Sequence, residues 1–246
     1  MEHFDKWQEY WDNYLLNKYG KQEVVSDADL YFQVARTIYK KPIEKPVFER
    51  ILDEITQGLA WKSMDILVDF CCGNGLFTYE LKDKVSRIIG VDFSSHIINT
   101  ANQFKKADNI TYCLNDGIEF LRNFNTTFPG VRPNKYINND SLAYFSVEQL
   151  EEILKLVVAI SGDNFHFLLR GVPNADLMWN YYNTDERKQK YLTDKANGDF
   201  SNDGLGKWWT REEVENACAK NGVNCMIHDQ DAELSNYRMD ILVTGQ

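Results

Sequence analysis

Four aspartates follow one another along the chain at nearly regular intervals, each at or just after the end of an apolar stretch. They are Asp69, Asp92, Asp116 and Asp140, separated by 23, 24 and 24 residues. Such an interval suits one strand–helix unit, so the pattern predicts a parallel sheet with the four carboxylates along one edge. Open α/β sheets bind ligands at the edge formed by the carboxyl ends of their strands. An aspartate after a strand is also a common helix cap, which is the alternative for each residue.

The first of these aspartates leads into a short glycine-containing segment, CCGNG, at residues 71–75. The apolar run 66–68 predicts a buried parallel strand, and apolar residues at helical spacing after the loop predict a helix. Gly73 and Gly75 permit a tight turn whose backbone N–H groups can approach a ligand closely. The alternative is an ordinary strand–helix turn that contains glycine. The third glycine of a dinucleotide-binding fingerprint, expected near Thr78, is missing.

These motifs resemble those of the class I S-adenosylmethionine-dependent methyltransferases. Residues 69–75, DFCCGNG, resemble motif I of that family, and the segments GVDFS at 90–94 and NDG at 115–117 resemble the two motifs that follow. The resemblance extends from about Pro46 to the C-terminus. Cys71 is the departure, because it stands where the family usually has the first glycine of the loop.

The resemblance implies a Rossmann-like, doubly wound α/β fold with a mostly parallel seven-stranded sheet whose last strand is antiparallel. It divides the chain into N-terminal helices at 1–45 and a methyltransferase domain at 46–246, with a helical insertion at 175–209 after the fifth strand. The N-terminal helices would close over the cofactor, or else pack on the flank of the sheet. The aromatic-rich insertion would be a cap over the substrate, or else an oligomer contact.

Local patterns place several helices within this framework. Ser26 with Asp29 predicts the start of a helix that carries Leu30, Val34 and Ile38 on one stripe. Capping boxes predict helices after Ser146 and after Thr210, and residues 123–134 have the composition of a loop.

The resemblance also implies the cofactor, S-adenosylmethionine, and the residues that bind it. Asp92 would accept hydrogen bonds from the ribose hydroxyls, Asp116 would accept the adenine amino group, and Asp69 with the loop amides would hold the methionyl end. Phe93 would lie against the adenine or in the core, and Arg36 would pair with the methionyl carboxylate. The predicted cofactor-binding residues are Arg36, Asp69, Cys71, Gly73, Gly75, Asp92, Phe93, Asn115, Asp116 and Gly117.

Methyl transfer from a sulfonium needs an in-line approach more than a strong acid, although a base assists an oxygen or nitrogen nucleophile. We expect Asp140 to orient or deprotonate the acceptor and Tyr144 to help place it, with a capping role for Asp140 as the alternative. Arg170 and Asn174 are expected to border the substrate. The predicted function is methylation of an oxygen or nitrogen atom of a small molecule. An NAD-dependent oxidoreductase and a non-catalytic S-adenosylmethionine-binding protein are the other classes.

Composition narrows the possible partners. A net charge of −10 disfavours a nucleic-acid substrate, which requires a basic surface. Five cysteines without metal-ligand spacing predict free thiols in a reducing compartment and no metal site. The chain has no apolar run of membrane-spanning length and no signal-like start, so we expect a cytoplasmic protein without a membrane partner. The sequence does not indicate an oligomeric state.

Overall fold

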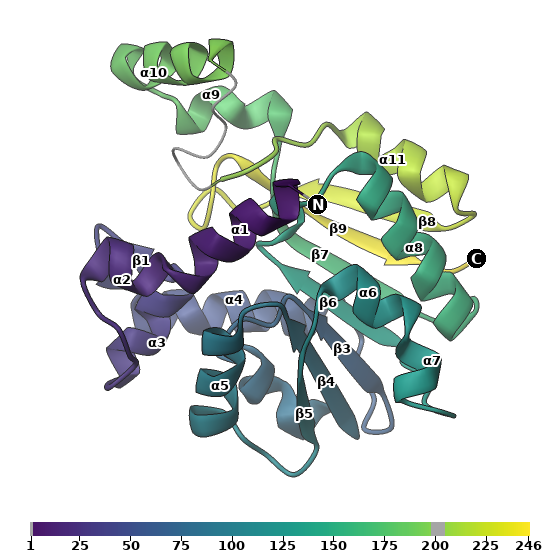
Figure 1. Cartoon of the computed structure of the whole chain (residues 1–246). Coiled ribbons are helices and arrows are strands. Elements are labelled where there is room, and N and C mark those ends of the chain that lie inside the picture. The colour runs from purple at the N-terminus through teal and green to yellow at the C-terminus, as the bar shows by residue number, and fades with distance from the viewer. Residues whose placement is uncertain (1, 198–204) are drawn as a thin grey trace. The chain divides into compact units, whose positions relative to one another are not determined.

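The computed structural model describes residues 2–197 and 205–246, and the chain forms two compact units, Met1–Ile137 and Asn138–Gln246. Seven strands form one mixed sheet in the order β5-β4-β3-β6-β7-β9-β8. Strands β5, β4, β3 and β6 pair in parallel, whereas β9 is antiparallel to both of its neighbours. This arrangement confirms the predicted doubly wound α/β fold with an antiparallel last strand (Figure 1).

The central parallel strands of the first unit are buried on both faces. They are β3 (Ile66–Phe70), β4 (Arg87–Asp92) and the beginning of β6 (Lys135–Asn139), whereas the edge strand β5 (Ile110–Leu114) is partly exposed. Leu67, Val68, Ile88 and Ile89 are fully buried, as expected of strands covered on both sides. The rigid, apolar centre of this unit therefore fixes where the ends of β3 and β4 lie.

Helices connect and cover these strands. They are α1 (Glu2–Asp12), α2 (Tyr14–Tyr19), α3 (Asp27–Gln33), α4 (Lys45–Gly58), α5 (Ser95–Phe104), α6 (Gly117–Arg122) and α7 (Phe124–Thr127). A small hairpin of β1 (Thr37–Ile38) and β2 (Lys41–Pro42) precedes α4. Ser94 caps α5 by accepting a hydrogen bond from the Ile97 amide at 3.3 Å. Figure 1 shows α5 beside β4 and β5, which it contacts.

The predicted stripe of Leu30, Val34 and Ile38 is wrong, because α3 ends at Gln33. The Ala35 amide donates to the carbonyl of Phe32 and the Arg36 amide to that of Tyr31, which is the bond pattern of a Schellman motif. Ala35 takes the left-handed conformation, with φ 55°, in the place where glycine is usual. With no glycine or asparagine to mark the end, the apolar spacing suggested a longer helix.

The segment after the glycine loop also differs from the prediction. It is a 3-10 helix, η1 (Thr78–Lys84), rather than an α-helix. This helix has only seven residues before the chain turns into β4, which is too few for a stable α-helix of ordinary length. Within the predicted loop at 123–134, the short helix α7 forms directly after Asn123 ends α6.

The second unit combines two long strands with capped helices. Its elements are η2 (Leu142–Tyr144), α8 (Val147–Ser161), β7 (His166–Pro173), η3 (Ala175–Leu177), α9 (Met178–Tyr181), α10 (Asp185–Ala196), α11 (Arg211–Lys220), β8 (Asn224–Asp229) and β9 (Arg238–Thr244). Both predicted capping boxes, at Ser146 and Thr210, are formed. Helix α11 packs on α8 and β8. The turns predicted at 198–204 lie outside the described residues.

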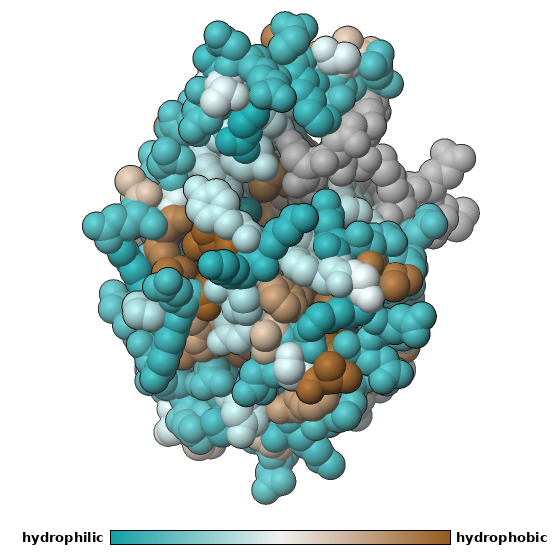
Figure 2. Space-filling model, turned by 90° about the vertical axis from the view of Figure 1, so that its left-hand side faces the viewer, coloured by the Kyte–Doolittle hydropathy of each residue, from teal (hydrophilic) through white to brown (hydrophobic). Residues whose placement is uncertain are grey.

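Most of the surface in Figure 2 is hydrophilic, and hydrophobic residues form small separate patches on the face shown. This agrees with a chain in which 26% of the residues are charged. Across the described ranges, 2–197 and 205–246, no helix has both the length and the apolar character needed to cross a bilayer.

Candidate active site

The glycine loop of the first unit contains three residues with left-handed backbone. Their φ angles are 63° at Cys71, 56° at Gly73 and 75° at Gly75. A Cβ on Gly75 would lie 2.3 Å from the hydroxyl oxygen of Tyr112, so no larger residue fits there without a shift. Cys71 adopts a conformation that costs an ordinary residue about 1–2 kcal/mol. The departure from the family's usual glycine therefore has a local energetic cost.

Asp92, at the end of β4, connects this loop to the next helix. Its Oδ2 accepts a hydrogen bond from the Gly73 amide at 3.1 Å, and its Oδ1 accepts one from the Ser94 amide at 3.0 Å. Burial raises the pKa of Asp92 to about 6, although the amides of Ser94, Gly73 and Phe93 lower it. The charge of Asp12, in α1, adds to the increase. This carboxylate is thus buried beside the loop and fixed in direction.

Asp69, in β3, is a second buried carboxylate at the same loop. Burial raises the pKa of Asp69 to about 7, and the negative charge of Asp92 contributes to this increase. The Thr78 hydroxyl donates a hydrogen bond to Oδ2 at 2.5 Å and lowers the pKa in part. Neither Asp69 nor Asp92 has an ion-pair partner among the described residues. The loop therefore combines two uncompensated carboxylates with glycine backbone, which suits a cationic ligand that also carries hydroxyl donors.

Helix α3 is attached to the loop by a buried polar contact that sequence reasoning missed. Asn74 is fully buried, and its Nδ2 donates to the Leu30 carbonyl at 2.8 Å and to Gln33 Oε1 at 3.0 Å. Gln33 in turn donates to the Thr100 hydroxyl at 3.0 Å. The position of Asn74 between two loop glycines was the feature of the sequence that could have indicated this contact. The N-terminal segment thus supports the loop from one side.

The remaining predicted cofactor residues are also in the first unit. The guanidinium of Arg36 lies over the Phe77 ring, 5.2 Å from its centroid. Phe93 is half-buried, and its carbonyl accepts a long hydrogen bond from Gln8 at 3.5 Å. The Asn115 amide donates to the Asp92 carbonyl at 3.0 Å, which joins the ends of β4 and β5.

Asp116 and Gly117 have structural roles at the start of α6. Asp116 caps this helix, because its Oδ1 accepts a hydrogen bond from the Glu119 amide at 2.8 Å. A Cβ on Gly117 would lie 2.4 Å from Cζ of Phe70, so glycine lets the helix approach β3 closely. The capping alternative is therefore realised for one oxygen of Asp116, and its contact with adenine stays a prediction.

In the second unit, Asp140 follows the end of β6 and forms an ion pair with Arg238 of β9. Arg238 was not among the predicted site residues, because nothing in its local sequence marks it. Burial alone lowers the pKa of Arg238, but the negative charge of Asp140 raises it above its ordinary value, and Tyr237 and Tyr144 also contribute. Tyr144 lies in η2, in the same unit. The predicted roles of Asp140 and Tyr144 stay predictions.

Arg170 and Asn174, predicted to border the substrate, are almost fully buried. Arg170 donates from Nη1 to Asn139 Oδ1 at 3.3 Å, and its Nε lies 3.9 Å from Asp240 Oδ2. Asn174 donates from Nδ2 to Asp229 Oδ1 at 2.8 Å. Their contacts within the protein favour a supporting role at this end of β7, and substrate contact stays a prediction.

Aromatic rings from three segments form a cluster in the second unit. Its members are Tyr181, Tyr182, Trp208 and Tyr237, with ring centroids 4.9–6.1 Å apart. Tyr181, Trp208 and Tyr237 are half-buried, so the cluster keeps exposed aromatic surface. The Arg238 guanidinium lies 5.5 Å from the centroid of the Tyr237 ring, which makes the cluster continuous with the Arg238–Asp140 pair.

All five cysteines are free thiols. Within the part of the chain that the structure describes, no three histidine, cysteine, aspartate or glutamate residues are grouped so as to hold a metal ion.

Comparison with protein families identifies the central part of the chain. Residues 67–160, from β3 through α8, match the family described as "Methyltransferase domain". This part of the chain thus matches a methyltransferase domain, and the fold is that of the class I methyltransferases. This class uses S-adenosylmethionine, and the two uncompensated carboxylates at the glycine loop fit its sulfonium, ammonium and ribose hydroxyls. The domain match favours methyl transfer over the oxidoreductase alternative. A comparison with curated proteins gave no match.

Solved structures share the fold over nearly the whole chain. A SAM-dependent methyltransferase from Anabaena variabilis is 19% identical, with 98% of this chain and 94% of that chain covered and a TM-score of 0.61. The cyclopropane synthase MmaA2 from Mycobacterium tuberculosis is 14% identical, with coverage of 99% and 98% and a TM-score of 0.64. Geranyl diphosphate C-methyltransferase from Streptomyces coelicolor is 14% identical, with coverage of 100% and 98% and a TM-score of 0.61. At these identities the likeness establishes the fold.

Proposed function

We propose that this methyltransferase binds S-adenosylmethionine at its glycine loop and methylates an oxygen or nitrogen atom of a small molecule. The observation that carries the proposal is the pair of buried carboxylates, Asp69 and Asp92, beside left-handed loop glycines. The cofactor supplies a methyl group on a sulfonium. When bound, it would transfer that methyl group to a lone pair of the acceptor, and the electron pair of the broken C–S bond would stay on sulfur.

The cofactor-binding residues act through hydrogen bonds and charge. Asp92 accepts the ribose hydroxyls, because a carboxylate has about four lone-pair sites and two are used by the amides of Gly73 and Ser94. Asp69 and the loop amides hold the methionyl end, and Arg36 pairs with its carboxylate. Asp116, Asn115 and Gly117 form the adenine side, and Phe93 lies against the ring. Residues 1–45 act as the lid over this site.

The acceptor-binding residues belong to the second unit. Asp140 accepts a hydrogen bond or the proton from the reacting group of the acceptor and so orients that group. Tyr144 helps place the acceptor. Arg170 and Asn174 hold the surrounding backbone, and the insertion at 175–209 forms the cap of domain 46–246. The half-buried rings of Tyr181, Trp208 and Tyr237 favour an acceptor with a flat, apolar body.

The partners and the compartment follow from charge and thiol chemistry. The acceptor is a small molecule rather than nucleic acid, because the net charge of −10 opposes phosphate binding. Five free thiols suit the reducing cytoplasm. We propose no membrane partner.

The test uses S-adenosylmethionine with an isotopically labelled methyl group and a small-molecule extract separated into fractions. We expect labelled product with the wild-type protein, much less with Asp92→Ala at a cofactor concentration near the wild-type Kd, and an oxygen- or nitrogen-linked methyl group in the purified product. A methyl group on carbon would refute the proposed acceptor atom. Binding of S-adenosylhomocysteine without transfer in any fraction would favour the non-catalytic alternative.

A further inference from the structure

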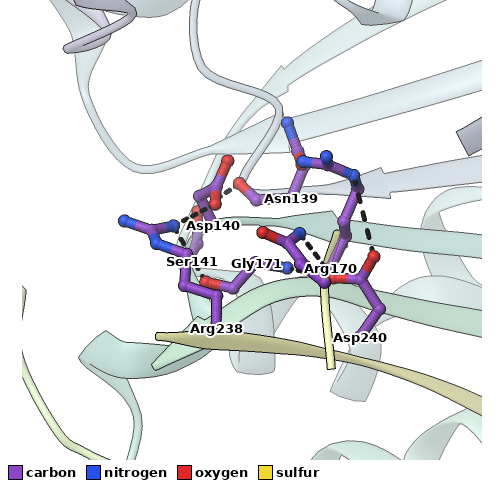
Figure 3. A network of polar contacts seen from close by, with 8 residues as sticks. Asn139, Asp140, Ser141, Arg170, Gly171, Arg238 and Asp240 are labelled. Atoms are coloured by element: carbon purple, nitrogen blue, oxygen red, sulfur yellow. Dashed lines mark hydrogen bonds and ion pairs between the residues drawn. The ribbon is translucent and has the colours of Figure 1, made fainter. Parts of the chain in front are cut away.

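The side chain of Asp140 is held by a residue that follows it by 98 positions in the sequence. Arg238 forms an ion pair with Asp140, and its Nη1 also donates to the Gly171 carbonyl at 2.9 Å (Figure 3). The side chains of Arg238 and Asp140 are 20% and 14% exposed. One guanidinium nitrogen thus ties the carboxylate to the backbone of β7.

The backbone around this pair is shaped to admit it. Asp140 takes a left-handed conformation with φ 61°, and its amide donates to the Arg170 carbonyl at 2.8 Å. The pairing of β7 with β9 shifts register between Leu169 and Val172, and Gly171 in that bulge has φ 71°. A Cβ on Gly171 would lie 1.8 Å from Asp140 Oδ1. The absence of a side chain at Gly171 therefore provides the space that the Asp140 carboxylate occupies.

A second charged pair fixes the other side of Gly171. Asp240 Oδ1 accepts hydrogen bonds from the Gly171 amide and from Gln230 Nε2, both at 2.7 Å. Its Oδ2 faces Arg170, as Figure 3 shows. The peptide groups of Gly171 are thus held at the carbonyl by Arg238 and at the amide by Asp240. The position of Asp140 is determined by interactions from β7 and β9 as well as by its own segment.

We propose that Arg238 is a positioning residue for methyl transfer, because it fixes the direction of the Asp140 carboxylate toward the acceptor. The inference rests on the proposed role of Asp140. A bidentate or shared arginine contact fixes a carboxylate geometrically better than a lysine does, since the planar guanidinium presents several N–H donors in a rigid fork. A misplacement of about 1 Å at a reacting group can cost about 10²-fold in rate.

The first test compares Arg238→Met and Arg238→Lys with wild type and with Lys220→Met. Lys220 pairs with Glu151 at 2.5 Å on the surface of the same unit and serves as the matched loss of a cation. We expect Arg238→Met to lower kcat by about 10- to 100-fold while S-adenosylhomocysteine affinity stays within about twofold. Arg238→Lys should recover part of this loss, and Lys220→Met should behave as wild type. A kcat of Arg238→Met within about twofold of wild type would overturn the inference.

Gly171→Ala displaces the carboxylate while keeping both charges, and should lower kcat in the same way. If Arg238→Met does not fold, as a melting curve shows, Arg238→Lys decides, and a wild-type kcat in that variant overturns the inference. A crystal structure of Arg238→Lys gives a readout independent of turnover. We expect the Asp140 carboxylate to move by more than about 0.5 Å, and an unmoved carboxylate also overturns the inference. Absence of turnover in the wild-type protein would instead count against the proposed function.

Discussion

The two units of the molecule differ in whether their buried carboxylates form ion pairs. In the first unit, Asp69 and Asp92 are buried beside the glycine loop without an ion-pair partner among the described residues, and their pKa values are raised. In the second unit, Asp140 is paired with Arg238 and Asp240 with Arg170. The first arrangement leaves negative charge for a ligand to neutralise, whereas the second balances its charge internally.

This difference indicates different tasks. A buried carboxylate without a counter-charge destabilises the ligand-free protein, because its charge is removed from water. A cationic or hydroxyl-bearing ligand offsets this free-energy cost when it binds. A carboxylate held by a guanidinium gains little from a further cation, but it has a defined direction. Binding free energy should therefore depend on the first unit and the rate of methyl transfer on the second. The following predictions test that division.

The largest expected effect is on turnover in the second unit. Asp140→Asn removes the negative charge but keeps a capping side chain, since asparagine caps about as well as aspartate. If Asp140 acts on the acceptor, single-turnover rates should fall by about 10²-fold or more while affinity for S-adenosylhomocysteine stays nearly constant. A rate within about twofold of wild type would show that Asp140 is not a catalytic residue.

In the first unit, Asp92→Ala should act on cofactor affinity instead. Loss of charge-assisted hydrogen bonds worth about 1.5–3 kcal/mol weakens S-adenosylhomocysteine binding by about 10- to 100-fold. Calorimetric titration measures the change, and Asp83→Ala is the control because the Asp83 side chain is 84% exposed. Unchanged affinity in Asp92→Ala would mean that the ribose is held by other groups.

The raised pKa values of the same carboxylates predict a pH dependence of cofactor binding. A ligand that donates hydrogen bonds to Asp92 requires its ionised form, so binding should weaken as the pH falls below about 6. At pH 5, protonation of a group with a pKa of about 6 reduces affinity roughly tenfold relative to pH 7.5. Calorimetry at both pH values should show this loss in wild type and a smaller loss in Asp92→Asn, in which Asp69 still becomes protonated over this range.

The stability of the ligand-free protein should change with pH in the opposite direction. The folded state holds protons on Asp69 and Asp92 above the ordinary aspartate pKa of about 3.9, so their contribution to stability decreases as pH rises from about 4 to 7. The free-energy cost of burying these two carboxylates in ionised form is absent below about pH 4 and complete above about pH 7. The rise in Tm on adding S-adenosylhomocysteine should therefore be larger at pH 8 than at pH 5.5, and an equal rise would contradict the assignment.

The smallest expected effect concerns the left-handed cysteine of the loop. Cys71→Gly should stabilise the fold by about 1 kcal/mol, because glycine adopts positive φ without a steric penalty. For a chain of this size that corresponds to a rise in Tm of about 2–4 °C. Cys113→Gly, within β5, should lower Tm instead. A lower Tm in Cys71→Gly would show that the thiol makes a compensating contact.

Prediction from sequence succeeded where a feature is encoded locally. The strand before the loop, the two left-handed glycines and the acid at the end of β4 lie within short segments with the expected composition. The capping box at Ser146 likewise depends on residues three positions apart. Such features are decided by backbone sterics and nearest neighbours, which a single sequence displays.

Features that depend on distant residues could not be predicted in this way. Arg238 reaches Asp140 only because β9 lies beside β7, and the register shift at Gly171 makes room for the pair. The early end of α3, with Ala35 in the left-handed conformation, also escaped prediction, since no glycine or asparagine marks that position in the sequence. The sequence thus indicated the geometry of the glycine loop better than the pairing of Asp140 with Arg238.

The most direct test of the central claim is a calorimetric titration of the wild-type protein with S-adenosylhomocysteine at pH 7.5, with Asp92→Ala in parallel. The glycine loop and its two uncompensated carboxylates predict binding in the micromolar range or tighter, about −8 kcal/mol, and a clear loss in the variant. The absence of binding heat with folded wild-type protein, at several temperatures, would contradict the claim that this loop is a cofactor site.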